Sequence, residues 1–133
     1  MKRISRSEQE TFDLGVGLGK KLKPGDCLAL YGELGTGKTT FVKGLAKARR
    51  VKEKVLSPSF VFSKVYGDKL AHFDFYRLEK PDLLLEAELA DIIAHGKHVV
   101  VIEWPERLSG LPARCKKVNF KYLSENEREI EFE

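Results

Sequence analysis

The sequence predicts an α/β fold in which a mainly parallel sheet is covered by helices and extended by antiparallel hairpins. Short, nearly all-apolar runs are typical of strands that are buried on both faces of a parallel sheet. Such runs occupy residues 27–31 and 98–104. Stretches with helical spacing of apolar residues alternate with them, at 7–22, 38–49 and 81–95. Alternating segments around turn residues add the hairpins.

The length of 133 residues predicts one domain spanning 1–133, and the 42% of hydrophobic residues are enough for a packed core. No apolar stretch approaches the roughly 18 residues that indicate a membrane span. Residues 1–10, MKRISRSEQE, lack the apolar segment of a secretory signal. We therefore expect a cytoplasmic protein that makes no membrane contact.

In the first half of the chain, Ser7 and Glu10 have the spacing of a capping box for the helix over 7–22. Apolar residues form a stripe along this helix, but the glycines between them oppose helix formation. These glycines are Gly15, Gly17 and Gly19. The sequence KPGD at 23–26 predicts a turn before the strand over 27–31. The helix over 38–49 places its apolar residues on one side, toward the sheet.

In the second half, GDK at 67–69 indicates a hairpin turn between strands at 60–66 and 70–78. Pro81 is expected to open the next helix, and Gly96 to end it. The tail segments KKVNFKYL and EREIEFE alternate apolar and polar residues on either side of SEN. They predict a final antiparallel hairpin.

The two cysteines, Cys27 and Cys115, lie far apart in the sequence, each within a strand-like run. No CxxC pair is present, and the three histidines do not show zinc-ligand spacing relative to the cysteines. We expect both cysteines to be reduced core residues and not a disulfide or a metal site.

The net charge is +4, from 24 basic and 20 acidic residues. Basic residues gather at 20–23, 47–54 and 115–117, where they could meet RNA or another polyanion. Acidic residues are interleaved with them, so solvated surface charge is the favoured interpretation of each cluster.

The stretch GELGTGKTTF at 32–41 contains Gly32-x-x-x-x-Gly37-Lys38-Thr39, the phosphate-loop pattern. Glycines let the chain curl so that successive backbone N–H groups face a phosphate, and the following helix directs its positive dipole end there. Because the motif follows an apolar run and opens a helix, we expect a nucleoside triphosphate to bind. The fold class is thus a P-loop NTPase-like three-layer sandwich.

Catalysis on a triphosphate requires a cation for the phosphates and oxygen ligands for Mg²⁺. Lys38 can supply the cation, and the Thr39 hydroxyl can ligate the metal. A carboxylate at the tip of a neighbouring strand should complete the site, and Asp74 and Glu103 are both candidates. One would be the metal partner and the other would position the attacking water, and the sequence does not decide between them.

Trp104 follows Glu103 directly, so a role in lining the site competes with that of a core residue. Arg77 could stabilise phosphate charge, but a surface salt bridge is the favoured interpretation.

The segments GELGTGKTTF, SPSF, HFDFYRL and IEWPERL resemble the TsaE (YjeE) family in order and spacing over about residues 8–108. The resemblance implies a compact ATPase that uses ATP and Mg²⁺ in bacterial tRNA threonylcarbamoyladenosine biosynthesis. It further implies two partner proteins, homologues of TsaB and TsaD, with TsaD modifying the adenosine beside the tRNA anticodon. ATP hydrolysis would reset that complex, and tRNA would be met through it.

By match to the family motifs, Lys38, Asp74 and Glu103 are expected to be catalytic, and Thr39, Glu103 and Asp74 to face the metal. The nucleotide contacts implied are Gly32, Gly35, Thr36, Gly37, Lys38, Thr39, Thr40, Trp104 and Glu8. Ser59 stands where the family has threonine, which keeps a hydroxyl in that loop.

Two alternatives use the same residues differently. A small P-loop kinase would transfer the terminal phosphate to a metabolite or nucleoside, although 133 residues leave little space for an acceptor pocket and an arginine-bearing lid. A basic RNA-binding module with a vestigial P-loop would explain the lysine clusters. A GTPase is disfavoured because no N-K-x-D motif is present.

Overall fold

The computed structural model describes residues 1–133. In chain order its elements are β1 (Lys2–Ser5), α1 (Glu8–Gly19), β2 (Cys27–Tyr31), α2 (Lys38–Ala48), β3 (Ser63–Tyr66), β4 (Leu70–Asp74), α3 (Leu83–His95), β5 (Val99–Glu103), the 3₁₀ turn η1 (Pro105–Arg107), β6 (Cys115–Tyr122) and β7 (Arg128–Phe132). No helix has both the length and the apolar character needed to cross a membrane.

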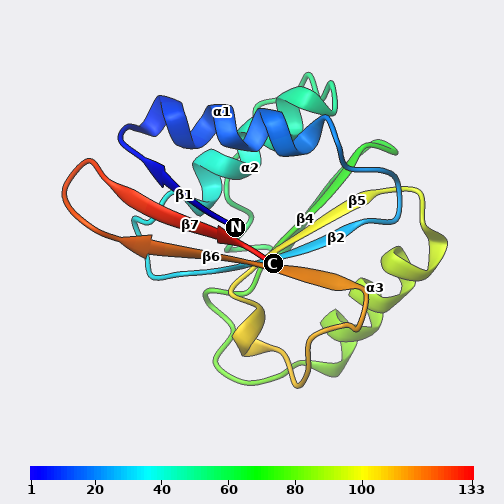
Figure 1. The fold of residues 1–133 in the computed structure, drawn as a ribbon. Coiled ribbons are helices and arrows are strands. Elements are labelled where there is room, and N and C mark those ends of the chain that lie inside the picture. Colours follow the sequence, from blue (N-terminus) through cyan, green and yellow to red (C-terminus); the bar gives the residue numbers. More distant parts are fainter.

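All strands join one seven-stranded sheet in the order β1-β7-β6-β2-β5-β4-β3. The four central strands, β6, β2, β5 and β4, are parallel, while β7, β1 and β3 pair antiparallel at the edges. Helices α1 and α2 cover one face and α3 the other (Figure 1). Each face has its own apolar cluster, one around Phe41 and Leu45 of α2 and one around Leu89 of α3. The predicted α/β class, with a parallel core and antiparallel additions, is confirmed.

Three elements differ from the prediction, each because of a hydrogen bond that the residue pattern does not show. Pro81 does not open α3, since the Asp82 side chain caps the helix by accepting hydrogen bonds from the N–H groups of Leu84 and Leu85. Strand β3 starts at Ser63 and not at 60, because the Pro58 carbonyl accepts from Val61 and Phe62 and forms a turn. Strand β1 was not predicted: three of its four residues are exposed, and its pairing depends on the distant β7.

The glycines of α1 have a packing function that outweighs their low helix propensity. A Cβ at Gly15 would lie 2.2 Å from the Phe41 carbonyl oxygen of α2. A Cβ at Gly44 would lie 2.1 Å from the Phe12 carbonyl oxygen of α1. The two helices therefore cross with their backbones in contact, which only glycine permits. Gly17, by contrast, faces open space.

The expectation of two reduced cysteines is wrong. Cys27 and Cys115 are the first residues of the neighbouring parallel strands β2 and β6, and they lie opposite each other in the register. Their Cα atoms are 4.4 Å apart and their sulfur atoms form a disulfide. The sequence could not show this because the two residues are separated by 88 positions and their pairing depends on the strand order.

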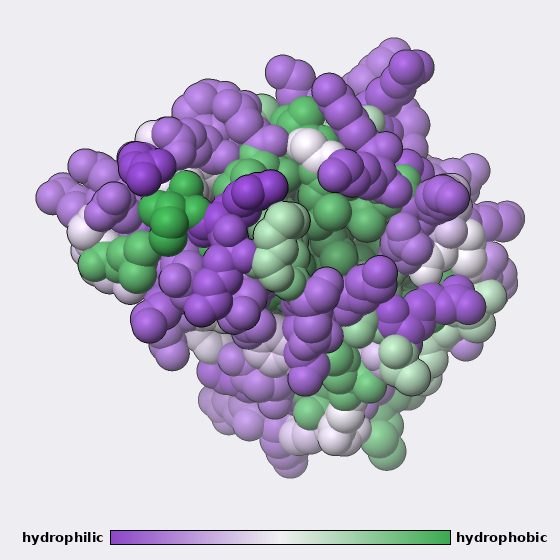
Figure 2. Space-filling model, viewed as in Figure 1, coloured by the Kyte–Doolittle hydropathy of each residue, from purple (hydrophilic) through white to green (hydrophobic).

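The molecular surface is mostly hydrophilic on the face drawn in Figure 2, with apolar side chains gathered near its centre. A cavity between α1 and the ends of the chain has Leu14, Leu18, Met1 and Phe132 among its lining residues. It lies apart from the loop that follows β2.

Candidate functional site

The loop of residues 32–37 joins β2 to α2 at the carboxyl edge of the parallel strands, the edge at which open α/β sheets bind ligands. Gly37 forms the N-cap of α2 in the left-handed conformation, with φ of 95°. Gly32 lies against β6, and a Cβ there would be 2.7 Å from the Phe120 carbonyl oxygen. The loop thus requires glycine at both ends. Its curl before the start of a helix is the geometry that presents backbone N–H groups to an anion.

Thr36 closes this loop from within. Its side chain is buried and donates a 2.7 Å hydrogen bond to the Glu33 carbonyl oxygen. The Thr36 hydroxyl is therefore engaged inside the loop, and its backbone N–H is the group left for a ligand.

The Lys38 side chain folds back into the loop, and the residue is only 4% exposed. Its ammonium donates a hydrogen bond to the Gly32 carbonyl and lies 3.9 Å from the centroid of the Trp104 ring. No carboxylate oxygen lies within 4.0 Å of it. Burial lowers the pKa of Lys38, and the negative charge of Glu103 opposes that shift. A desolvated cation without a charged partner fits an anionic group of a ligand.

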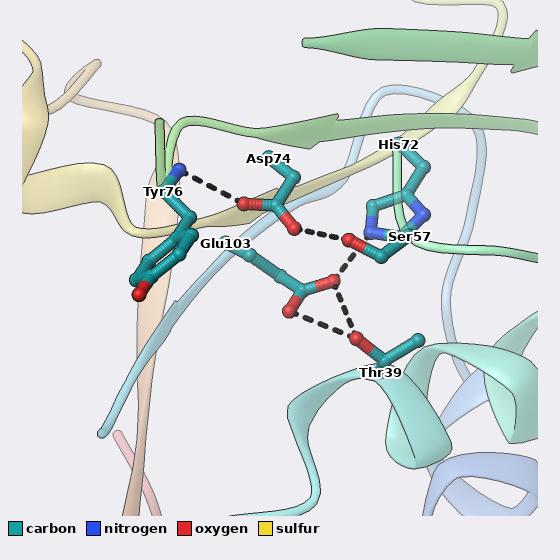
Figure 3. A network of polar contacts seen from close by, with 6 residues as sticks. All are labelled: Thr39, Ser57, His72, Asp74, Tyr76 and Glu103. Carbon is teal, nitrogen blue, oxygen red and sulfur yellow. Dashed lines mark hydrogen bonds and ion pairs between the residues drawn. The ribbon is translucent and has the colours of Figure 1, made fainter. Parts of the chain in front are cut away.

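Glu103 and Asp74 end the neighbouring parallel strands β5 and β4 and face each other in the register. Both carboxylates are buried. The Thr39 hydroxyl, in the first turn of α2, lies 3.2 Å and 3.3 Å from the two carboxylate oxygens of Glu103 (Figure 3). The structure therefore brings together Lys38, Thr39 and both predicted acids.

Three further residues complete this network (Figure 3). The Ser57 hydroxyl donates a 2.5 Å hydrogen bond to Asp74, and the Tyr76 N–H donates to the other Asp74 oxygen at 3.0 Å. His72 Nε2 lies 2.6 Å from Glu103 Oε2. None of these roles was predicted. The period-two alternation of a strand was a usable signal for His72, since it places residues 72 and 74 on one face.

Trp104 lines a cavity at the site, in agreement with the predicted role there. Its backbone has φ of 58°, an uncommon conformation for an aromatic residue, directly after the strand that ends in Glu103. The ring packs against that of Tyr76, with centroids 5.1 Å apart. This turn directs the indole toward the Lys38 ammonium.

The favoured interpretation of Arg77 as a salt-bridge residue is wrong, because no carboxylate lies within 4.0 Å of it. Its guanidinium stacks 3.8 Å from the centroid of the Phe60 ring. Arg77 lines a cavity of about 370 Å³ together with Ser59, Asp74 and Glu103. The side chain is therefore a cation that lines the same cavity as the two acids.

A second cavity, of about 350 Å³, lies on the other side of the loop. Gly35, Gly37 and Thr40 line both cavities. The second one is otherwise formed by the start of α1 and by the tail hairpin, and its lining residues include Ser7, Glu8, Thr11, Glu125, Asn126 and Arg128. Glu8 contacts the Thr40 hydroxyl at 3.5 Å, which places both predicted residues here.

The tail hairpin carried no predicted site residue, yet it reaches the loop through Arg128. The Arg128 Nε–H donates a 3.1 Å hydrogen bond to the Gly35 carbonyl, and the guanidinium lies 4.5 Å from the centroid of the Tyr122 ring. This contact spans 93 positions and depends on the strand order, so no local pattern could indicate it.

The residues present fit a Mg²⁺–phosphate group. Thr39, Asp74 and Glu103 offer the hard oxygen donors that Mg²⁺ prefers. No group of three or more His, Cys, Asp or Glu residues forms a metal cage. Protein sites commonly hold Mg²⁺ by one or two carboxylates together with substrate phosphates, and Asp74 and Glu103 are two carboxylates beside the loop.

Comparisons with known proteins identify the family of the chain. The family model described as "Threonylcarbamoyl adenosine biosynthesis protein TsaE" matches residues 5–130. Proteins named tRNA threonylcarbamoyladenosine biosynthesis protein TsaE are similar to the chain. The one from Treponema pallidum is 37% identical, over 98% of both chains, and the one from Bacillus subtilis is 40% identical, over 83% of this chain and 70% of that protein. The crystal structure of Bacillus subtilis YdiB superposes with a TM-score of 0.79 at 32% identity, covering 99% of this chain and 83% of that one. The chain therefore belongs to the TsaE family.

Proposed function

We propose that this protein hydrolyses ATP with Mg²⁺ in tRNA threonylcarbamoyladenosine biosynthesis. The observation that carries the proposal is the Lys38 ammonium, enclosed by the glycine loop without a carboxylate partner while Thr39 contacts Glu103 beside it. A cation, a hydroxyl and a carboxylate converging on one loop are the groups that phosphoryl transfer requires.

The backbone N–H groups of the loop and the start of α2 bind the phosphates and replace the water lost on binding. Lys38 leaves the Gly32 carbonyl and pairs with the phosphate oxygens. When bound, Mg²⁺ neutralises charge that develops on the phosphates.

The structure favours a division of roles between the acids that the sequence left open. Glu103 is assigned to the metal side, because its carboxylate contacts the Thr39 hydroxyl. Asp74 has no contact with Thr39 and is oriented by Ser57 and the Tyr76 N–H. Asp74 is therefore assigned to orient the water that attacks the terminal phosphate.

The nucleoside is assigned to the second cavity. The terminal phosphate lies at the Lys38 and Glu103 side, so the base and ribose extend to the opposite side of the shared loop. Glu8 and Asn126 offer polar groups there, and Arg128 holds the tail hairpin in place against Gly35.

The pathway assignment follows from the names of the relatives. Homologues of TsaB and TsaD are the partners that we propose for it. Exposed apolar residues near the first cavity suit a protein contact. Phe60 is 76% exposed and stacks on Arg77, and Leu34, 62% exposed, lines the cavity itself. A partner that covers them would exclude water from the site.

The proposal is tested by measuring phosphate release from ATP and Mg²⁺, alone and with TsaB and TsaD from the same source. We expect slow turnover that the partners raise, with inorganic phosphate as the product. Unchanged turnover with the partners would refute their role. A phosphorylated metabolite as the product would instead establish a kinase.

A further inference from the structure

The contact between His72 and Glu103 is the only one in the molecule in which a basic side chain lies within 4.0 Å of a carboxylate. The His72 Nε2 and Glu103 Oε2 atoms are 2.6 Å apart, and the two side chains are 0% and 3% exposed. The residues lie on the adjacent strands β4 and β5, where Glu103 stands two positions beyond Val101, the register partner of His72. This diagonal is within reach of a long side chain across a sheet.

The other ring nitrogen of His72, Nδ1, is buried and has no hydrogen-bond partner. The imidazole therefore makes a single polar contact, and a carboxylate can only accept, so Nε2 carries the hydrogen and donates it to Glu103. A buried histidine with one orphaned nitrogen is not a favourable core residue. The hydrogen bond to Glu103 is therefore the feature from which a role for His72 can be inferred.

The Glu103 carboxylate has several rotatable bonds and touches α2 only through the 3.2 Å and 3.3 Å contacts with Thr39. The shorter bond from His72 fixes Oε2 from the sheet side. With Oε2 held by His72, the plane of the carboxylate is fixed, and both of its oxygens face the Thr39 hydroxyl (Figure 3).

We propose that His72 is a positioning residue that sets the orientation of the Glu103 carboxylate toward the metal and the terminal phosphate. This inference rests on the proposed ATP and Mg²⁺ site. Outer groups that hydrogen-bond a ligating carboxylate commonly change metal affinity or activity by about 10–100-fold when removed.

The test compares three variants at this position. His72→Leu removes the donor. His72→Gln places an amide N–H at the position of Nε2, whereas the shorter His72→Asn places its amide at that of Nδ1. The matched control is His98→Gln, because His98 Nε2 contacts the Gly67 carbonyl at 2.7 Å near the opposite edge of the sheet.

Two readouts are measured: turnover, and the Mg²⁺ concentration that half-saturates the Trp104 fluorescence response to a non-hydrolysable ATP analogue. We expect His72→Leu and His72→Asn to lower turnover about 10–100-fold and to raise the half-saturating Mg²⁺ concentration about tenfold. Analogue affinity at saturating Mg²⁺ should stay within about twofold. His72→Gln should restore most of both readouts, and His98→Gln should change neither.

Equal values for His72→Gln and His72→Asn would overturn the positioning role, and this comparison holds even if His72→Leu does not fold. The Mg²⁺ titration separates this inference from the proposed hydrolysis. A wild-type protein that binds the analogue with Mg²⁺ but releases no phosphate contradicts hydrolysis alone, while the titration still decides the role of His72. A wild-type protein that binds no analogue overturns both.

Discussion

The Lys38 ammonium lies 3.9 Å from the centroid of the Trp104 ring and donates a hydrogen bond to the Gly32 carbonyl. The loop after β2 and the turn after β5 thus meet at one cation. A bound phosphate offers this ammonium a stronger, charge-assisted partner than either a ring or a carbonyl. Nucleotide binding should therefore separate Lys38 from Trp104.

Trp104 is the single tryptophan of the chain, so its fluorescence should report that separation. We expect ATP with Mg²⁺ to change the emission of the wild-type protein at saturable concentrations. Lys38→Met should weaken the apparent affinity by at least about tenfold, because it removes a charged hydrogen bond of about 1.5–3 kcal/mol. Emission that stays constant over the titration would show that no phosphate reaches this cation.

The pH dependence of binding should follow the Lys38 ammonium. Burial lowers its pKa below the ordinary value of 10.5, and anionic phosphates favour the charged form. Affinity should thus be highest below the lowered pKa and fall as the pH rises through it. In Lys38→Met, affinity should be weak but flat over the same window. Titrations at a series of alkaline pH values check this, and parallel losses in both proteins would assign the effect to another group.

The same shift has a consequence for folding. The unfolded chain holds the Lys38 proton up to about its ordinary pKa of 10.5, whereas the folded chain releases it earlier. The free energy of unfolding of the ligand-free wild type should therefore rise with pH relative to Lys38→Met between the two values. Urea unfolding of both proteins across that window measures the difference.

Glu103→Gln should separate binding from hydrolysis. The amide keeps the volume of the carboxylate but loses its charge, so we expect nucleotide affinity within about threefold of wild type and turnover reduced by about 100-fold or more. Lys38→Ala should lose both. Glu79→Gln is the matched control, since Glu79 is an exposed acid in the loop before α3. Equal losses of affinity in the Glu103 and Lys38 variants would contradict this division.

The parts of the site that the sequence predicts are those encoded locally. The spacing from Gly32 to Thr39 fixes the loop and the helix start, and an acid that directly follows an apolar strand must emerge at the same edge. Ser57 and Arg128 were missed because the residues they contact are 17 and 93 positions away in the sequence. The Cys27–Cys115 pairing was missed for the same reason.

The close packing of α1 against α2 can be tested with two glycine-to-alanine substitutions in α1. Gly15→Ala should lower the free energy of unfolding by about 1–3 kcal/mol, because the new Cβ would overlap the Phe41 carbonyl of α2. Gly17→Ala, on the same helix but in open space, should raise it by about 0.5–1 kcal/mol. Urea unfolding at equilibrium measures both, and a neutral Gly15→Ala would contradict the backbone contact.

The disulfide should affect stability and not nucleotide binding, because Cys27 and Cys115 begin their strands at the edge opposite the loop. Reduction, or Cys115→Ala, should lower the free energy of unfolding by about 2–5 kcal/mol. Cys115→Ala should leave turnover nearly unchanged. The measurement is the thermal unfolding midpoint of the wild type with and without a reductant, compared with that of Cys115→Ala. A wild-type protein insensitive to a reductant that demonstrably frees both thiols would count against a stabilising bridge.

The central claim is that the loop from Gly32 to Lys38 holds the phosphates of ATP. It is tested most directly by a crystal structure with a non-hydrolysable ATP analogue and Mg²⁺. We expect the phosphates to accept hydrogen bonds from the loop N–H groups and Lys38, with the metal beside Thr39 and Glu103. An analogue bound elsewhere, with Lys38 still on Trp104 and Gly32, would contradict the account.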